Sequence, residues 1–167
     1  MKALSLILIF SIITAFSHAT PTLVTQPQIN QSPILYYAQE NDNQDKMTRP
    51  TGTCNYKVII ETSCRSPQYT TDRISISFGD AHGSEVFIPR LDDPRAGRFE
   101  QCTMVSFDIV GQCLNDICKL YLHRVGSNGW IPTTVTAYNY GYPPVKFYYN
   151  TYVPENVDYG FNHCNEV

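Results

Sequence analysis

The run Asp80-Ala-His-Gly-Ser84 carries the three side-chain types that hydrolases use as acid, base and nucleophile. A catalytic triad needs members that converge from separate parts of a fold onto an oxyanion hole, whereas neighbours in one turn point apart. His123 falls on the outward side of an alternating segment, and for His163 local packing is the simpler account. No nucleophile elbow, zinc-protease motif or phosphate loop occurs in the sequence. The sequence therefore predicts a protein that is not an enzyme.

Carboxylates beside turns offer a second kind of chemistry, which is calcium binding. Asp72 and Asp80 are the best candidates, because each lies next to a turn that follows or precedes an apolar strand pattern. Calcium takes roughly six to eight oxygen ligands, which carboxylates and loop carbonyls can supply. EF-hand spacing is absent, and an aspartate beside a turn commonly caps its own backbone. Both interpretations, calcium ligand and backbone cap, stay open at this point.

Aromatic side chains crowd the C-terminal part of the chain, where ten of the 21 aromatics lie between Trp130 and Phe161. Tyr138, Tyr140 and Tyr142 share one side of an alternating segment and are candidates for a binding surface. Tyrosine has an apolar ring and a polar tip, so an exposed series suits a lipid headgroup, a sugar ring or a protein groove. The alternative is that they only cover strands. Trp130 is either a loop-tip anchor or a plug at the end of the fold.

The six cysteines all lie between residues 54 and 164. An even number in an oxidising compartment predicts three disulfides and no cofactor, and the Cys-x-x-Cys pairs of structural zinc sites are missing. Cys113 and Cys118 are separated by four residues that include the turn-forming Asn115 and Asp116, so a hairpin end could bring them together. The first core strand opens at Cys54 and the last segment closes at Cys164, and we expect these two segments to be antiparallel neighbours. The expected pairs are Cys54 with Cys164, Cys64 with Cys102, and Cys113 with Cys118.

The elements that position the candidate residues are β-strands. Apolar side chains recur at every second position in segments of the chain from residue 53 onward. Tyr56, Val58 and Ile60 alternate with Asn55 and Lys57, which is typical of a half-buried strand. Clusters of Gly, Pro and Asp separate the strands, and no amphipathic helix pattern follows the N-terminal segment. Seven or eight short strands predict an all-β antiparallel sandwich. Further strands are expected over residues 74–78, 86–88, 105–109, 120–122, 131–137 and 145–149.

The N-terminus is typical of a secretory signal. Lys2 precedes an uncharged run over residues 4–16, and small residues end at Ala19. The run is shorter than the roughly 20 residues that a membrane-spanning helix needs, which disfavours an uncleaved anchor. We therefore expect a signal peptide over 1–19, a flexible Pro, Gln and Asn-rich leader over 20–50, and one sandwich domain over 51–167.

Composition excludes other classes of protein. The chain has 12 Lys and Arg against 15 Asp and Glu, a net charge of −3 that does not suit a nucleic acid partner. Only 16% of the residues are charged while 43% are hydrophobic, which indicates a packed core rather than disorder. No second long apolar run follows the signal, so we expect no integral membrane protein and a destination outside the cell.

Several segments together match a known pattern, and they are residues 54–64, 71–81, 89–94, 99–102, 120–126 and 128–132. They resemble the plant embryo-specific secreted proteins. That family combines a signal peptide with one PLAT/LH2 domain, a β-sandwich also attached to lipoxygenases and lipases. The resemblance covers about residues 51 to 164 and includes the motif Asn128-Gly-Trp-Ile-Pro132.

The resemblance implies a fold of two packed four-stranded sheets. It implies a non-catalytic binding module of the apoplast or cell wall, linked to seed or embryo development, with a protein partner or a lipid surface as its ligand. Several PLAT domains bind calcium at loops on one end of the sandwich, and Thr71-Asp72 matches the family's Thr-Asp step. The alternative from another class is an apoplastic enzyme or enzyme inhibitor, which would need a pocket with converging titratable groups.

Overall fold

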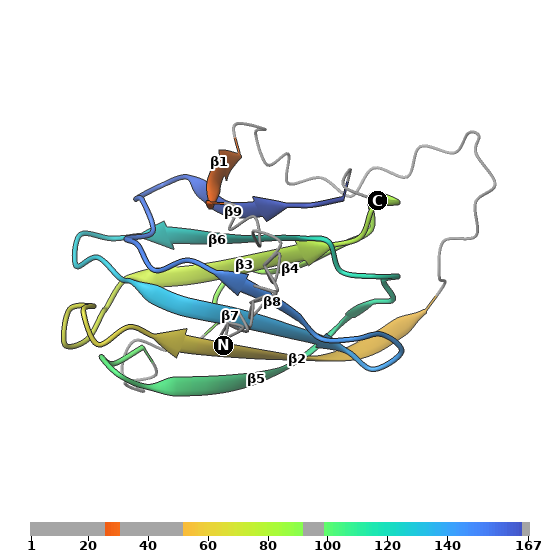
Figure 1. Ribbon diagram of the computed structural model, residues 1–167, viewed down its shortest axis with the longest axis horizontal. Coiled ribbons are helices and arrows are strands. Elements are labelled where there is room, and N and C mark those ends of the chain that lie inside the picture. The colour runs from red at the N-terminus through yellow and green to blue at the C-terminus, as the bar shows by residue number, and fades with distance from the viewer. Residues whose placement is uncertain (1–25, 31–51, 92–98, 165–167) are drawn as a thin grey trace, which may run out of the picture.

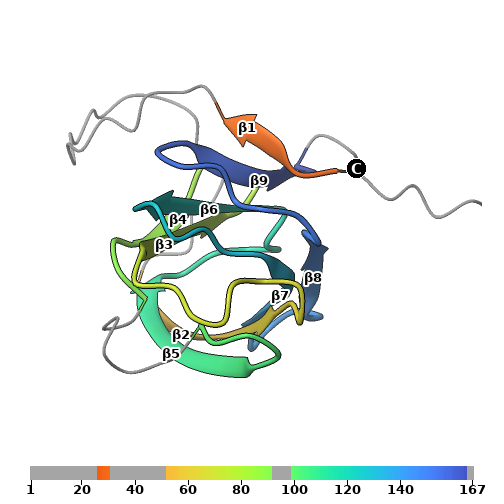
Figure 2. The same ribbon diagram turned by 90° about the vertical axis from the view of Figure 1, so that its left-hand side faces the viewer.

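Two antiparallel sheets pack face to face (Figures 1 and 2). The computed structural model describes residues 26–30, 52–91 and 99–164. The expected signal peptide over 1–19 and most of the expected leader lie outside the described residues. The strands are β1 (Gln28–Asn30), β2 (Thr53–Thr62), β3 (Arg73–Gly79), β4 (Glu85–Ile88), β5 (Met104–Gln112), β6 (Lys119–Val125), β7 (Pro132–Asn139), β8 (Val145–Tyr148) and β9 (Asp158–Asn162).

One sheet has the strand order β5-β2-β7-β8 and contains the clearest alternation in the sequence. Tyr56, Val58 and Ile60 of β2 point into the sandwich and are buried. The residues between them face outward, where the register places Lys57 opposite Asp108 of β5 and Tyr138 of β7. Because the side-chain period of a strand is two, this register sends one set to the core and the other to the outer face.

The other sheet has five strands in the order β1-β9-β6-β3-β4, one more than predicted. The antiparallel β-sandwich is confirmed, but β1 and β9 were not expected. The strand β1 lies inside the segment predicted to be a flexible leader and pairs with β9, Ile29 opposite Tyr159. The apolar pattern of β9 is short, because only Tyr159 and Phe161 turn toward the core and Gly160 lies between them. Asp158 and Asn162 lie on the other side of the strand.

Aromatic rings fill the space between the sheets. Tyr56 and Phe78 meet edge to face with ring centroids 5.2 Å apart, and Trp130 packs on Phe99 at 4.9 Å. Burying each large ring contributes about 2–3 kcal/mol, so these contacts account for much of the stability of a small sandwich. The core is built from all the strands that the alternation predicted.

All six cysteines form disulfides, and one of the three predicted pairs is confirmed. Cys64 is bonded to Cys102, with Cα atoms 4.4 Å apart. These residues extend the pairing of β2 with β5, in which Glu61 lies opposite Met104. The other two bonds join Cys54 to Cys113 and Cys118 to Cys164, so the predicted pairs Cys54–Cys164 and Cys113–Cys118 are wrong.

Sheet membership explains both errors. The segment between Cys113 and Cys118 is not a hairpin, because it leads from β5 in one sheet to β6 in the other. Cys113 follows β5 and therefore lies beside Cys54 on the neighbouring β2. Cys118 precedes β6, whose first residue pairs with the last residue of β9, so Cys118 lies beside Cys164. Each correct bond joins neighbours within one sheet, whereas Cys54 and Cys164 belong to different sheets.

Stability at alkaline pH is expected to depend on Tyr149. Its hydroxyl donates a hydrogen bond to the carbonyl of Leu120 at 3.3 Å, and burial raises the pKa of Tyr149 well above 10.0. Above pH 10 the unfolded chain therefore loses this proton more readily than the folded chain, and stability falls as pH rises. Between about pH 9 and about pH 11 the urea midpoint should fall less in Tyr149→Phe than in the wild type. Equal falls would contradict this account.

Candidate functional site

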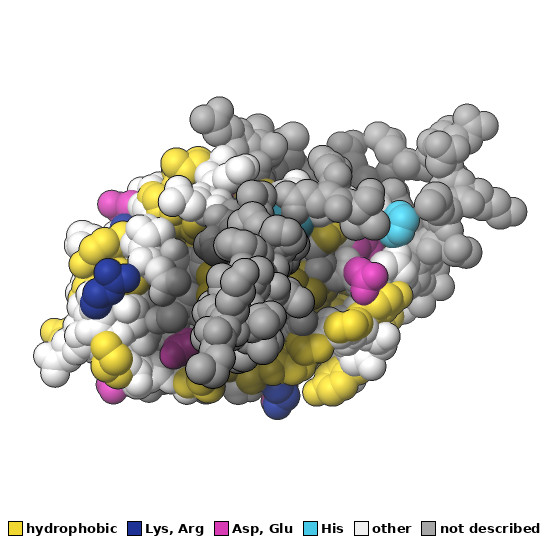
Figure 3. All heavy atoms as spheres, viewed as in Figure 1, with side chains coloured by type: hydrophobic (Ala, Val, Ile, Leu, Met, Phe, Trp, Pro, Cys, Tyr) yellow, Lys and Arg dark blue, Asp and Glu magenta, His cyan; other side chains and the backbone are white. Residues whose placement is uncertain are grey.

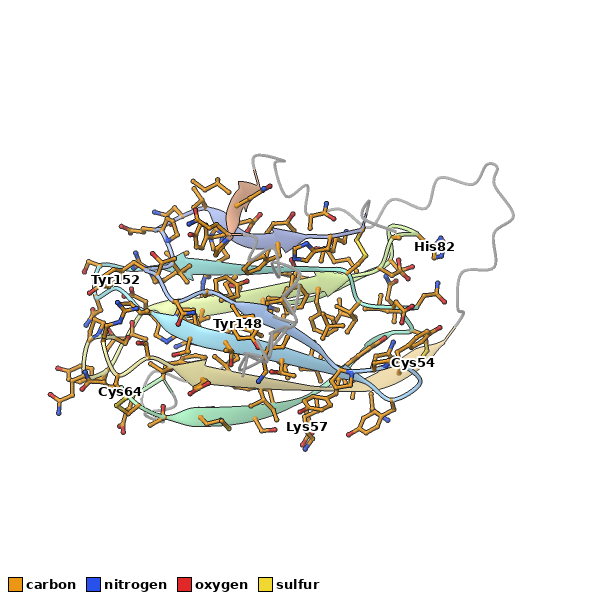
Figure 4. All side chains as sticks on the ribbon, in the orientation of Figure 1. Cys54, Lys57, Cys64, His82, Tyr148 and Tyr152 are labelled. Carbon is orange, nitrogen blue, oxygen red and sulfur yellow. A yellow bond between two sulfur atoms is a disulfide. The ribbon has the colours of Figure 1, made fainter. Side chains whose placement is uncertain are left out.

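The predicted site residues lie at both ends of the sandwich rather than together. Figure 4 shows Tyr152 and Cys64 at one end, and Cys54 and His82 at the other. Asp72 precedes β3 and Asp80 follows it, so the two calcium candidates lie at opposite ends of one strand. They do not share a site. Among the described residues, no group of three or more His, Cys, Asp or Glu side chains is placed to hold a metal ion.

Asp72 is a buried carboxylate whose oxygens are held by protein donors. It pairs with the guanidinium of Arg124, which is also buried. The backbone N–H groups of Asn128 and Gly129 donate to it at 3.1 and 3.0 Å. Gly126 has a φ of 139°, and a Cβ there would collide with this carboxylate. Asp72 thus ties the β6–β7 loop to the start of β3.

Asp80 has a similar role at the opposite end. It accepts hydrogen bonds from the backbone N–H groups of His82 at 2.9 Å, Ser84 at 3.0 Å and Asn115 at 3.1 Å. The carboxylate contacts the backbone of His82 and Ser84, not the imidazole or the hydroxyl, so the three side chains form no relay. Asp80 caps the backbone of its own turn, whereas Asp72 caps the backbone of a distant loop. Calcium binding at either residue stays a prediction.

The remaining histidines also have structural partners. His123 on β6 lies 3.0 Å from Asp158 on β9, with Nδ1 facing a carboxylate oxygen. His163 stacks on the rings of Phe147 and Phe161. The stacking agrees with the local packing that the sequence suggested for His163.

Trp130 is a core residue and not a surface anchor. Its exposed fraction is 0%, and its indole N–H donates to the hydroxyl of Thr62 at 3.2 Å. The plug interpretation is correct because the loop before it is folded back onto the sandwich by the hydrogen bonds of Asn128 and Gly129 to Asp72. The tip of the loop therefore presents no indole to a surface.

The three candidate tyrosines do not form one face, because β7 ends at Asn139. Tyr138 is half-buried on the outer face of the sheet, whereas Tyr140 and Tyr142 belong to the turn that follows. Tyr140 is 74% exposed. Tyr142 donates from its hydroxyl to the side-chain oxygen of Asn115 at 3.3 Å. Only Tyr140 therefore offers a largely free ring.

An open pocket of about 640 Å³ lies beside Tyr140, on the outer face of the four-stranded sheet. Pairing of β2 with β5 places Val110 opposite Asn55, and Tyr140 follows the residue that pairs with Tyr56. Asn55 is therefore flanked by an apolar side chain and an aromatic ring. The lining residues are Thr53, Cys54, Asn55, Tyr56, Asp108, Ile109, Val110, Asn139, Tyr140 and Gly141.

The walls of this pocket are held rigidly. Cys54 is bonded to Cys113, which fixes the start of β2. The amide of Asn139 donates to the carbonyls of Leu114 and Asn115 at 3.0 and 2.9 Å, and its own carbonyl accepts from the N–H of Tyr142 at 2.8 Å. The backbone that carries Tyr140 is thereby fixed before any ligand arrives, which lowers the entropic cost of binding.

Tyr56 connects this pocket to the interior. Its hydroxyl donates to the carbonyl of Gln112 at 2.7 Å and accepts from the N–H of Leu114 at 2.8 Å. Burial, and to a lesser degree the charge of Asp80, raises the pKa of Tyr56 above 10.0. The phenol stays neutral at physiological pH and has a structural rather than an acid–base role here.

Exposed apolar side chains share the same outer face. Met104, Val110 and Tyr148 are exposed by 67%, 64% and 53%. Met104 and Tyr148 lie in one cross-strand row through Glu61 and Thr134. Figure 4 shows Lys57 extending from this face, and Figure 3 shows hydrophobic side chains along the β5 and β2 side of the molecule. We call the outward side of β5, β2, β7 and β8 the outer face.

Comparison with known families decides the relationship. The model of the embryo-specific protein 3 (ATS3) family matches residues 41–164. The chain belongs to this family. It is 44% identical to embryo-specific protein ATS3B of Arabidopsis thaliana over 159 residues, which are 95% of the chain and 82% of the relative. It is 45% identical to ATS3A of the same plant over 154 residues, 92% of the chain and 81% of the relative.

Solved structures confirm the fold of this family member. A lipoxygenase matches 66% of the chain with a TM-score of 0.57 and 22% identity. A coral 8R-lipoxygenase, described as activated by calcium through a C2-like domain, matches 65% with a TM-score of 0.57 and 22% identity. The chain spans only 16% and 17% of these two enzymes, so the likeness is to their PLAT/C2-like sandwich alone.

The pocket residues Asn55, Asp108 and Val110 were not among the sequence candidates. The alternation placed Asn55 and Asp108 on the outward side of their strands, but nothing in it paired these two strands.

In the part of the chain that the structure describes, no helix has the length and apolar character needed to cross a membrane. Three disulfides are typical of proteins that fold in an oxidising compartment.

Proposed function

We propose that this chain is a secreted, non-catalytic binding module of the developing seed or embryo, and that its outer face binds a protein partner. The family supports the seed and embryo setting, and the disulfides and the signal-like N-terminus support secretion. The observation that carries the partner is the exposure of Met104, Val110 and Tyr148 on one face. A face that carries several exposed apolar side chains is a candidate interaction surface.

A protein partner suits this face better than a lipid surface. The best candidate for membrane insertion, Trp130, is buried, and the outer face is the broad side of a sheet rather than a loop tip. The pocket gives less support to the alternative of an apoplastic enzyme than to a binding module. Of its lining residues, Asp108 is the one carboxylate, and it is exposed and paired with Lys57 at 3.2 Å.

Affinity capture with matched variants tests this proposal. The wild type, a variant with Met104→Thr, Val110→Thr and Tyr148→Thr, and a control with Tyr69→Thr and Tyr152→Thr would be used as baits in extracellular fluid of developing seeds. Threonine keeps the strand propensity, so the fold should survive. Proteins bound by the wild type should drop roughly tenfold with the outer-face variant and stay unchanged with the control.

Equal capture by all three baits would contradict the proposal. Binding of purified wild type to protein-free liposomes, lost in the outer-face variant, would replace the protein partner by a lipid surface. Thermal melting of each variant must match the wild type before the capture is interpreted.

A further inference from the structure

We infer that the pocket beside Tyr140 is a binding site for a neutral glycan, with the exposed ring as a stacking platform and Asn55 and Asp108 as hydrogen-bonding groups. The inference deepens the proposed function, because the site lies at one end of the outer face and the glycan belongs to the bound partner or to the surrounding cell wall. It rests on the lining chemistry, the placement of its groups and their rigidity.

The lining chemistry excludes other ligand classes. No Lys or Arg is among the lining residues, so an anionic phosphate or sulfate has no counter-charge there. The nearby Lys57 is already paired with Asp108. A divalent cation would find only one carboxylate. An acyl chain needs a deep apolar cavity, whereas this pocket is open and carries the polar side chains of Thr53, Asn55 and Asp108.

A neutral sugar ring fits the aromatic and polar groups that line this pocket. A pyranose has an apolar face of C–H groups that packs on an aromatic ring, and equatorial hydroxyls that both donate and accept hydrogen bonds. Tyr140 supplies a ring that is 74% exposed. Asn55 supplies an amide donor and acceptor, and Asp108 supplies an acceptor through Oδ2, since Lys57 pairs with Oδ1. Val110 offers a second apolar surface, on the other side of Asn55 from Tyr140.

The placement of these groups suits a chain of sugars. Asn55 lies between β5 and the Tyr140 turn, and Asp108 and Lys57 lie two residues further along the same two strands. Polar groups therefore continue along the outer face beyond the first sugar. The Cys54–Cys113 bond and the hydrogen bonds of Asn139 hold the walls in place, so little ordering is required on binding.

Isothermal titration calorimetry tests the site directly. The probes are three neutral cell-wall oligosaccharides, cellohexaose, mannohexaose and a xyloglucan oligosaccharide, with an anionic oligogalacturonide as the comparison. The wild type should bind at least one neutral probe. Tyr140→Ala should weaken that binding roughly tenfold, whereas Tyr140→Phe, which keeps the ring, should change it less than about threefold. Asn55→Ala should weaken it as well.

The control variant is Tyr152→Ala, which removes an exposed tyrosine at the opposite end of the sandwich and should leave binding unchanged. Absence of binding to every neutral probe, equal binding of the oligogalacturonide, or an undiminished affinity in Tyr140→Ala would overturn the inference. A partner captured through Met104 and Tyr148 without any glycan binding would leave the proposed function intact and reject the glycan alone. Capture that is lost after enzymatic removal of glycans from the partner would support both.

Discussion

Replacing Asp72 by alanine is expected to destabilise the protein by about 3–5 kcal/mol, because it leaves the guanidinium of Arg124 buried without its counter-charge. The side chains of Asp72 and Arg124 are 2% and 9% exposed, so water cannot replace the lost partner. The same change removes the acceptor for the N–H groups of Asn128 and Gly129. Urea unfolding of the wild type and the variant measures the difference.

The matched control is the exposed ion pair of Lys57 and Asp108, whose atoms lie 3.2 Å apart. Asp108→Ala should cost less than about 1 kcal/mol, since its partner stays in water. A similar cost for both variants would show that burial does not decide the effect. The result also bears on calcium, because a lost calcium response in Asp72→Ala reports a lost ligand only if the variant is still folded.

Alternation predicted seven of the strands because apolar side chains on one face of each reach the core. The pattern of Tyr56, Val58 and Ile60 is direct evidence of that environment. The strand β9 escaped detection because its apolar alternation is limited to Tyr159 and Phe161, with Gly160 between them. The strand β1 has only three residues, and its Ile29 is exposed, so its pairing depends on backbone hydrogen bonds that sequence patterns do not record.

Most of the disulfide pairing and the partners of the site residues could not be predicted from the sequence, because both depend on the topology of the fold. Cys64–Cys102 was predicted correctly, but the other bonds depend on which strands share a sheet. The aspartates were recognised as loop residues, whereas their partners come from distant segments: Arg124 for Asp72, and Asn115 for Asp80. Of the aromatic candidates, Tyr140 is exposed and Trp130 is buried, and local sequence did not separate them because it does not say which way a loop folds.

Trp130→Ala is expected to cost about 3–5 kcal/mol in stability, the largest effect of any single truncation among the candidate aromatics. The indole is fully buried, packs on the ring of Phe99 at a centroid distance of 4.9 Å and satisfies the hydroxyl of Thr62. Truncation leaves a cavity at the end of the sandwich and one unpaired buried hydroxyl. Thermal unfolding followed by circular dichroism gives the melting temperature, which should be more than about 5 °C lower in Trp130→Ala than in the wild type.

The comparison with Tyr140→Ala separates packing from surface binding, since Tyr140 is 74% exposed and its removal should change stability by less than about 0.5 kcal/mol. Trp130→Phe should recover part of the loss, because it refills most of the cavity but cannot donate to Thr62. If Trp130→Ala melted like the wild type while Tyr140→Ala unfolded early, the indole would be at the surface and the pocket wall would be part of the core. That outcome would reverse the assignment of both residues and remove the basis for the glycan site.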